Sequence, residues 1–360
     1  MKPEWTFDSE ALSRFRQFIE IISPSMEEVP MANFLRSKWK EAGAKIDTDV
    51  MGNVYASVGE SNALNLGIVA HMDTVAVQIT KILSGGMLQL RHIGLRPHTL
   101  LGQPMKVVTR QGIIDGVIGF DPTSQYGQPK GLVDEDLWMD IGATNYEQAA
   151  AMVQPGDLAV LAPRFAKMGS HFVSGTAIDD RVGLFVMDEC LTWFSAHPVP
   201  INLHFIGSAQ EEVGLRGSAV IASNRKLDAC IVLDVDYATD TPTPHENQMG
   251  SLHMGKGVGL HVKSDVNAVL RRIALKVAKD NQTDHQLTLG RFIYGGTDST
   301  ALQIQQAGIA TLNMNIPCRY MHSPVEMCHQ HDIECCIQLL IALISELGRS
   351  GQHSFIPGID

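Results

Sequence analysis

The sequence predicts an α/β protein with a mixed sheet that is covered by helices on both faces, and with a small all-β domain inserted into it. Four apolar runs have the length of buried strands, at about residues 64–70, 201–209, 229–233 and 309–316. Helical periodicity recurs between and after these runs, at about residues 180–195, 215–225, 265–280 and 331–347. In open α/β sheets of this kind, binding sites form at the carboxyl ends of the strands.

The N-terminal segment predicts two helices before the first buried strand. Apolar residues share one face of a helix at about residues 9–22. Ser25, followed three positions later by Glu28, predicts a capping box at the start of a second helix that ends near Glu41. Residues 45–58 then alternate in polarity as one or two strands would.

Residues 76–164 have a different character. Glycine and proline are frequent there, helical periodicity is weak, and short β-type runs recur at about residues 105–109, 112–118, 137–141 and 157–161. We therefore predict that this segment is a β-rich insert, and that residues 1–75 and 165–360 together form one discontinuous α/β domain.

Composition limits the compartment and the partners. The formal net charge of −11 argues against nucleic acid as a main partner, because phosphate binding needs basic patches. No apolar run reaches the roughly 18–20 residues of a membrane span, and the N-terminus lacks the layout of a signal peptide. The six cysteines contain no C-x-x-C pair, which is typical of free thiols in a reducing compartment. We predict a cytoplasmic protein with no membrane partner.

Histidines and carboxylates stand at the ends of the predicted strands. The candidates are His71, Asp73, Asp179, Asp180, Glu211, Glu212, Asp234 and His322. Each of them taken alone has an ordinary explanation in a surface turn or a helix cap. Gathered at one edge of a sheet, they would instead form a pocket able to hold two metal ions.

His71 and Asp73 follow the first buried strand. Residues two apart on a strand share a face, so the Asp73 carboxylate could orient the imidazole of His71 by hydrogen bonding. Asp179 and Asp180 open a predicted helix, where acidic residues also serve as simple caps. One of these two carboxylates could bridge two metal ions while the other supports the site.

Glu211 and Glu212 are the sharpest local signal, because two adjacent carboxylates follow an apolar strand. In a turn, both side chains can face one site, so that one binds metal and the other takes a proton from water. Asp234 follows the next apolar run, but Asp236 stands two residues later and spacing does not decide between them. His322 supplies a second histidine.

These segments occur in an order that resembles the di-zinc aminopeptidases of the glutamyl and deblocking family, whose members often form tetrahedral shells. The matching segments are residues 70–73, 179–183, 211–217, 234–242, 295–298 and 319–324. The resemblance covers nearly the whole chain, and in that family the β-rich insert is a dimerisation domain.

The resemblance implies a metallo-aminopeptidase with two divalent metal ions per subunit, zinc or else cobalt or manganese. Asp179 would bridge the two ions. His71 and Asp234 would complete one metal site, and Glu212 and His322 the other.

The resemblance also implies that Glu211 is the general base and that Asp73 orients His71. Gly296, Thr297 and Arg319 are expected to contact the substrate, a small peptide. The peptide bond after Asp179 is expected to be cis. The protein is expected to be a homo-oligomer, built from dimers and extending to a dodecameric shell.

The chain departs from the family at Thr74-Val75-Ala76, where an acid and small residues are usual, and at Cys318 beside the Arg319 segment. These changes bear on the substrate. One alternative is therefore an amidase or deacylase that acts on acylated amino acids or a specialised small peptide. A second is a non-catalytic assembly protein with structural metals, although such sites are normally closed and need no base.

Overall fold

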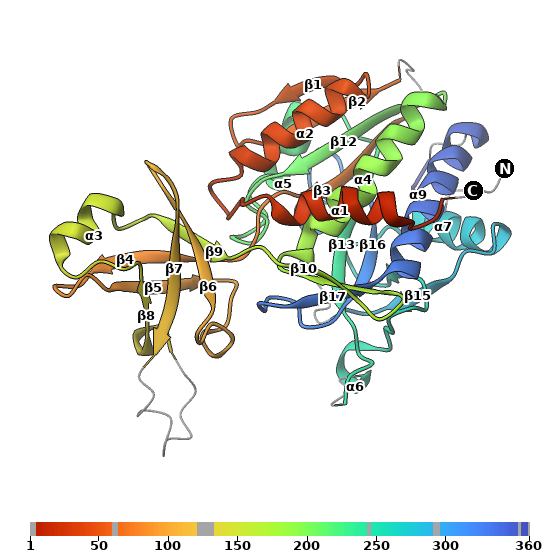
Figure 1. Ribbon diagram of the computed structural model, residues 1–360. Coiled ribbons are helices and arrows are strands. Elements are labelled where there is room, and N and C mark those ends of the chain that lie inside the picture. The colour runs from red at the N-terminus through yellow and green to blue at the C-terminus, as the bar shows by residue number, and fades with distance from the viewer. Residues whose placement is uncertain are drawn as a thin grey trace.

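The computed structural model describes residues 5–59, 64–120, 133–242, 246–290, 296–351 and 354–358. Figure 1 shows an α/β domain and a smaller β-barrel that projects from it. The chain enters the barrel directly after β3 (Asn65–His71), the strand that ends at the first predicted metal ligand. None of the helices in the described ranges is long and apolar enough to cross a bilayer.

The α/β domain is built on a mixed sheet of eight strands, in the order β1-β2-β12-β3-β13-β16-β14-β15. These strands are β1 Lys45–Thr48, β2 Val54–Val58, β3 Asn65–His71, β12 Asn202–Ser208, β13 Ala229–Tyr237, β14 Val258–His261, β15 His285–Thr288 and β16 Ala310–Cys318. The four predicted buried strands are the central ones, β12, β3, β13 and β16, and they pair in parallel. Their carboxyl ends therefore meet at one edge, as the prediction required.

Helices cover both faces of this sheet, which confirms the predicted fold class. The helices of the domain are α1 Ser9–Glu20, α2 Val29–Glu41, α4 Ile178–Ala196, α5 Ser218–Asn224, α6 Glu246–Met249, α7 Ala268–Asp280, α8 Asp298–Leu302 and α9 Gln330–Ser350. Alternate strand residues face opposite layers. Ile68 packs in the large core with α1, α2, α4, α7 and α9, whereas Val69 packs with α5 and α8.

The strand β13 is longer than predicted, and this changes the position of Asp234. Its pairing with β3 stops at Val232, but its pairing with β16 continues to Tyr237. Asp234 therefore lies within the strand rather than after it. Because β13 no longer pairs with β3 at this position, the Asp234 side chain still reaches the open edge of the sheet.

The predicted capping box at Ser25 is wrong. Helix α2 begins at Val29 with Glu28 at its N-cap, and no side chain caps it. The Glu28 carboxylate instead accepts hydrogen bonds from the amides of Met26 and Gln210, at 2.9 and 3.1 Å. These tertiary partners replace the local cap, because the start of α2 packs against the loop that follows β12.

The barrel is closed and has its own apolar core. Its strand order is β4-β5-β8-β7-β6-β9. The strands are β4 Ala76–Ile82, β5 Leu88–Ile93, β6 Pro104–Thr109, β7 Gly112–Phe120, β8 Leu137–Asp140 and β9 Leu158–Leu161, with helix α3 Tyr146–Met152 and short 3-10 turns at Pro97–Thr99 and Asp134–Asp136. A further three-stranded sheet joins β10 Phe165–Met168, β11 Phe172–Gly175 and β17 Glu326–His329.

Candidate active site

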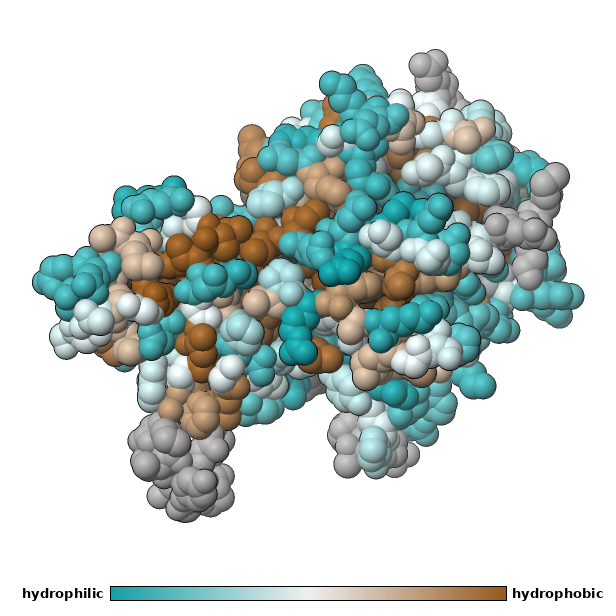
Figure 2. Space-filling view, viewed as in Figure 1, coloured by the Kyte–Doolittle hydropathy of each residue, from teal (hydrophilic) through white to brown (hydrophobic). Residues whose placement is uncertain are grey.

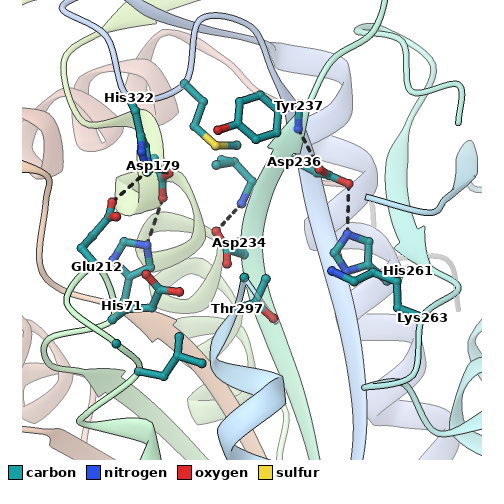
Figure 3. Close-up of a pocket in the computed structure, with 16 residues that line it drawn as sticks. His71, Asp179, Glu212, Asp234, Asp236, Tyr237, His261, Lys263, Thr297 and His322 are labelled. Carbon is teal, nitrogen blue, oxygen red and sulfur yellow. Dashed lines mark hydrogen bonds and ion pairs between the residues drawn. The ribbon is translucent and has the colours of Figure 1, made fainter. Parts of the chain in front are cut away.

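The predicted metal ligands converge on one pocket of about 340 Å³ at the carboxyl edge of the sheet. They come from five separate parts of the chain, namely the end of β3, the start of α4, the loop after β12, the strand β13 and the turn between β16 and β17. Figure 3 shows His71, Asp179, Glu212, Asp234 and His322 turned toward one another. The pocket is lined by His71, Asp179, Glu211, Glu212, Gly214, Leu215, Asp234, Val235, Asp236, Tyr237, His261, Lys263, Gly296, Thr297, Met321 and His322.

The Asp179 carboxylate lies between the two histidines. Its Oδ1 is 3.0 Å from Nε2 of His71, and its Oδ2 is 3.3 Å from Nε2 of His322. Glu212 Oε1 lies 3.3 Å from the same His322 nitrogen. This is the arrangement in which one carboxylate can bridge two cations, each held also by a histidine. The peptide bond between Asp179 and Asp180 is cis, as the resemblance implies.

Both histidines point Nε2 into the pocket and Nδ1 away from it. Nδ1 of His71 lies 3.0 Å from the carbonyl oxygen of Asp73, and Nδ1 of His322 lies 3.1 Å from that of Gly94. A carbonyl can only accept, so these contacts place a proton on Nδ1. In the neutral ring, Nε2 then offers its lone pair to the pocket, which is the usual state of a metal-ligating histidine. Gly94 belongs to the segment that follows β5, so the barrel contributes directly to this site.

Carboxylates outnumber the lysine and arginine side chains near this site, which are Lys263 at the pocket wall and the buried Arg181. Burial, and after it the neighbouring carboxylates, raise the pKa of Asp234 and of Asp180 well above the ordinary value. No lysine or arginine in the described part of the chain forms an ion pair with any carboxylate of this cluster. The Oε1 atom of Glu212 is buried and makes no hydrogen bond with the described residues. The donor set therefore fits divalent cations, which would supply the missing positive charge.

Two groups of three side chains bring their ligand atoms within 4.8 Å of one another. One group is His71, Asp179 and Glu212, and the other is His71, Asp180 and Asp234. The second group contains Asp234 and not Asp236, which favours Asp234 where spacing left the choice open. It also brings in Asp180, whose Oδ2 accepts a hydrogen bond from the His71 amide at 3.3 Å.

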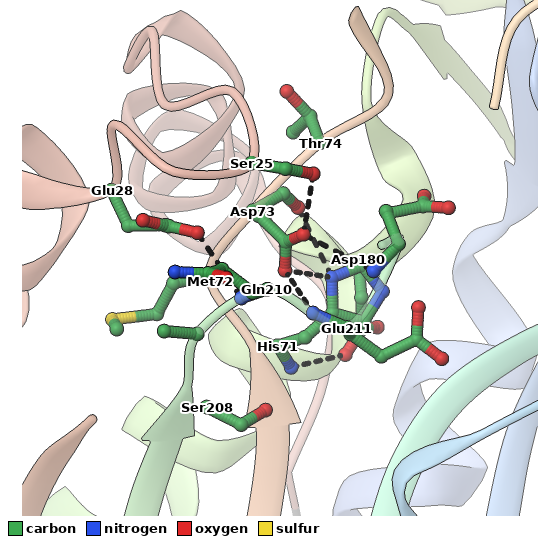
Figure 4. Close-up of polar contacts among 12 residues, drawn as sticks. Ser25, Glu28, His71, Met72, Asp73, Thr74, Asp180, Ser208, Gln210 and Glu211 are labelled. Atoms are coloured by element: carbon green, nitrogen blue, oxygen red, sulfur yellow. Dashed lines mark hydrogen bonds and ion pairs between the residues drawn. The ribbon is translucent and has the colours of Figure 1, made fainter. Parts of the chain in front are cut away.

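Asp73 holds the glutamate loop against β3 (Figure 4). Its buried carboxylate accepts hydrogen bonds from the amides of Glu211 and Glu212, at 2.9 and 3.1 Å, and from the hydroxyl of Ser25 at 2.7 Å. It also lies 3.4 Å from Nδ1 of His71. Although burial raises the pKa of Asp73, its contact with His71 and these hydrogen bonds outweigh burial and leave that pKa below the usual value. Asp73 thus links the histidine to both glutamates.

We expect Asp73→Asn to cost roughly 2–3 kcal/mol of stability and to lower kcat as well, because a charged acceptor of several hydrogen bonds becomes a neutral amide. Denaturant unfolding with a parallel activity assay would measure both effects. Ser25→Ala removes a single donor and should cost only about 1 kcal/mol. Equal unfolding midpoints for wild type and Asp73→Asn would contradict the assignment.

The geometry has counterparts in known proteins. The profile of the M42 glutamyl aminopeptidase family matches residues 52–339. This chain belongs to the M42 family. It is 32% identical over 314 residues to the lysyl aminopeptidase of Pyrococcus furiosus. The aligned region covers 86% of this chain and 89% of that protein. It is 24% identical over 354 residues to the glutamyl aminopeptidase of Lactococcus lactis, which covers 94% and 97%.

Solved structures agree with this family. The TET aminopeptidase of the marine sediment archaeon Thaumarchaeota archaeon SCGC AB-539-E09 superposes with a TM-score of 0.90 at 29% identity, covering 96% of this chain and 99% of that one. The dodecameric PhTET1 structure gives a TM-score of 0.83 at 29% identity, covering 92% and 98%. The chain is therefore a peptide hydrolase of the M42 metallopeptidase family.

Not every predicted substrate contact of this M42 peptidase lies in the pocket. Gly296 and Thr297 line it, while Gly295 of the same motif lies outside the described residues. Arg319 does not line it. Its guanidinium binds Asp240 through Nε and Nη2, at 2.9 and 2.8 Å, so its position favours a structural role.

Other residues of the site carry no clear signal in the sequence and were not predicted. Glu326 accepts hydrogen bonds from the amides of Asp179 and His322, at 2.9 and 2.8 Å, and so ties two predicted ligands together. His261 and Lys263 line the pocket from β14 and the residues after it. The sequence signal for His261 and Lys263 was the alternation of apolar and polar residues at the end of a short apolar run. No local pattern marks Glu326.

Proposed function

We propose that this M42 peptidase removes N-terminal residues from small peptides, using two divalent ions and Glu211 as the general base. The observation that carries the proposal is the Asp179 carboxylate, which lies between Nε2 of His71 and Nε2 of His322. We assign His71 and Asp234 to one ion, Glu212 and His322 to the other, and Asp179 to both. Imidazole and carboxylate ligands suit zinc, and also cobalt or manganese.

Two divalent ions bound there would lower the pKa of a water molecule and polarise the carbonyl of the scissile peptide bond. The chain's own groups then move the protons. Glu211 lines the pocket beside Glu212 and is not needed as a ligand in this assignment. It takes a proton from the attacking water and delivers it to the nitrogen of the leaving peptide. Asp73, which binds the Glu211 amide, positions this base.

The shape of the cavities suits cleavage at a chain end. The catalytic pocket shares Tyr237, Met321 and His322 with a larger cavity of about 830 Å³. Arg96 and His98 of the barrel line that larger cavity. We infer that the N-terminal residue occupies the inner pocket and that the rest of the peptide extends toward the barrel. Asp236 and Lys263 both line the inner pocket, so charges of both signs face the bound side chain.

A panel of chromogenic substrates tests the activity. Chelator-treated protein would be assayed on aminoacyl and N-acylated compounds, with and without added zinc, cobalt or manganese. Metal-restored cleavage of free-amine substrates alone supports the aminopeptidase. Metal-restored cleavage of acylated substrates alone would establish the deacylase instead. A metal-loaded protein that cleaves nothing across the panel would favour an assembly role.

We also propose that the protein is a homo-oligomer whose barrel forms the dimer contact. The similar PhTET1 protein is a dodecamer. Apolar residues gather on the visible face of the barrel and where it meets the α/β domain (Figure 2). On β7, Ile113 and Val117 are about half exposed, at 52% and 50%, and their spacing puts them on the same face of the strand. Exposed apolar patches of this kind mark interfaces between subunits.

Replacing both Ile113 and Val117 with Asp is expected to shift the protein to smaller species in sedimentation velocity, because burying two charges in an apolar contact is costly. The matched control is Val50→Asp, a fully exposed position in a turn of the α/β domain, which should leave the mass unchanged. If the double variant kept the mass of the wild-type oligomer, this face of the barrel would not be part of the subunit interface.

A further inference from the structure

A third group of potential metal ligands lies outside the catalytic pocket. It consists of Asp284, His331 and Cys335, whose ligand atoms all lie within 4.8 Å of one another. His331 and Cys335 stand one turn apart at the start of α9, and Asp284 precedes β15 in the segment that follows α7. None of the three lines the pocket that holds His71 and His322.

The spacing of the nitrogen and sulfur atoms in this group fits a tetrahedral site. Nε2 of His331 lies 3.5 Å from Sγ of Cys335 and 2.9 Å from Oδ2 of Asp284. Zinc bonds of about 2.3 Å to sulfur and about 2.0–2.1 Å to nitrogen or oxygen put neighbouring ligand atoms roughly 3.3–3.6 Å apart. The sulfur–nitrogen distance already matches, and the nitrogen–oxygen distance needs only a small shift of the exposed Asp284 side chain.

The surroundings of His331 also suit a metal ligand. The same nitrogen, Nε2, faces both a carboxylate and a sulfur, and one ring proton cannot serve both well. The other ring nitrogen, Nδ1, lies 3.8 Å from Oε2 of Glu334, which is close enough for an ion pair and too far for a hydrogen bond. Cys335 is buried whereas the Asp284 side chain is 68% exposed, so solvent can reach the group from one side.

We propose that Asp284, His331 and Cys335 bind a divalent transition metal of the zinc or cobalt type, with water as the fourth ligand. When the sulfur–metal bond forms, the Cys335 thiol releases its proton to solvent. The ion would fasten the first turns of α9 to the segment that leads into β15. This site is separate from the catalytic ions and does not depend on the proposed aminopeptidase activity.

Cobalt distinguishes the two kinds of site by their ligands. The ligands proposed for the catalytic ions are only nitrogen and oxygen atoms, whereas the new site contains a thiolate, which is a soft ligand. Chelator-stripped full-length protein would be titrated with cobalt(II) without oxygen, and its near-ultraviolet absorption followed. We expect an intense thiolate-to-cobalt band in the wild type. Cys335→Ser should lose this band and about one bound ion per chain, while keeping its peptidase activity.

Controls separate the proposal from its alternatives. Cys318→Ser, at another buried cysteine, should keep the band. Asp284→Asn changes an exposed side chain and keeps the thiol, so it tests the site even if Cys335→Ser does not fold. Its band should need at least about tenfold more cobalt to saturate. A wild-type protein without the band at saturating cobalt would overturn the proposal and leave His331 as an ion-pair partner of Asp284. A band that survives in Cys335→Ser would overturn it as well.

Discussion

Glu211→Gln is expected to reduce kcat by about 10²–10⁴-fold while leaving the two metal ions bound. The substitution keeps the size of the side chain and removes its capacity to accept a proton. Glu211 contributes its amide to Asp73, at 2.9 Å, and this backbone hydrogen bond remains in the variant. The loop should therefore keep its place. Steady-state kinetics together with metal analysis by mass spectrometry would measure both quantities on the same sample.

The adjacent carboxylate provides the matched control. Glu212 lies 3.3 Å from His322 Nε2 and is assigned to an ion, so Glu212→Gln should lower metal content first and activity as a consequence. Excess metal should restore part of the activity of Glu212→Gln and none of that of Glu211→Gln. If Glu211→Gln kept wild-type kcat, another group would have to be the base.

Asp179→Asn is expected to weaken the binding of both ions by more than about 100-fold, because even partners that only support metal ligands contribute about 10–100-fold. The Asp179 carboxylate lies 3.0 Å from Nε2 of His71 and 3.3 Å from Nε2 of His322. Bound metal per chain after dialysis, with circular dichroism as a folding check, would measure the effect. The Asp179 amide still donates a hydrogen bond to Glu326 in the variant, so the start of α4 should keep its conformation.

Asp188→Asn controls for the loss of a buried carboxylate from the same helix. Asp188 lies further along α4, where burial raises the pKa of its carboxyl to about 6, and its partner is Lys38 at 3.1 Å rather than a site residue. Its metal content should match that of the wild type. Asp234→Asn should weaken the binding of one ion and leave the binding of the other unchanged. Retention of both ions by Asp179→Asn would contradict the bridging role.

Hydrophobic pattern was enough to predict the central architecture. The runs that became β3, β12, β13 and β16 are mainly apolar, because parallel strands covered by helices on both faces bury nearly all of their side chains. Strands with a solvent-facing side were harder to recognise. In β4, exposed Thr80 and Lys81 break the apolar alternation, and a register shift occurs at the same place. The barrel closes through pairings that no local pattern encodes.

The sequence by itself determined which side chains stand at or near the strand ends, since most strand termini follow from where apolar runs stop. Asp234 is the exception, because β13 continues past it to Tyr237. Their mutual distances came only from tertiary structure. Ser25 illustrates the difference, because its local pattern predicts a helix cap, yet its hydroxyl binds Asp73, which is 48 positions away. His322 depends in the same way on the Gly94 carbonyl, 228 positions away in the barrel. A hydrogen bond between distant segments depends on how helices and barrel pack on the sheet, and that packing is decided by the whole chain.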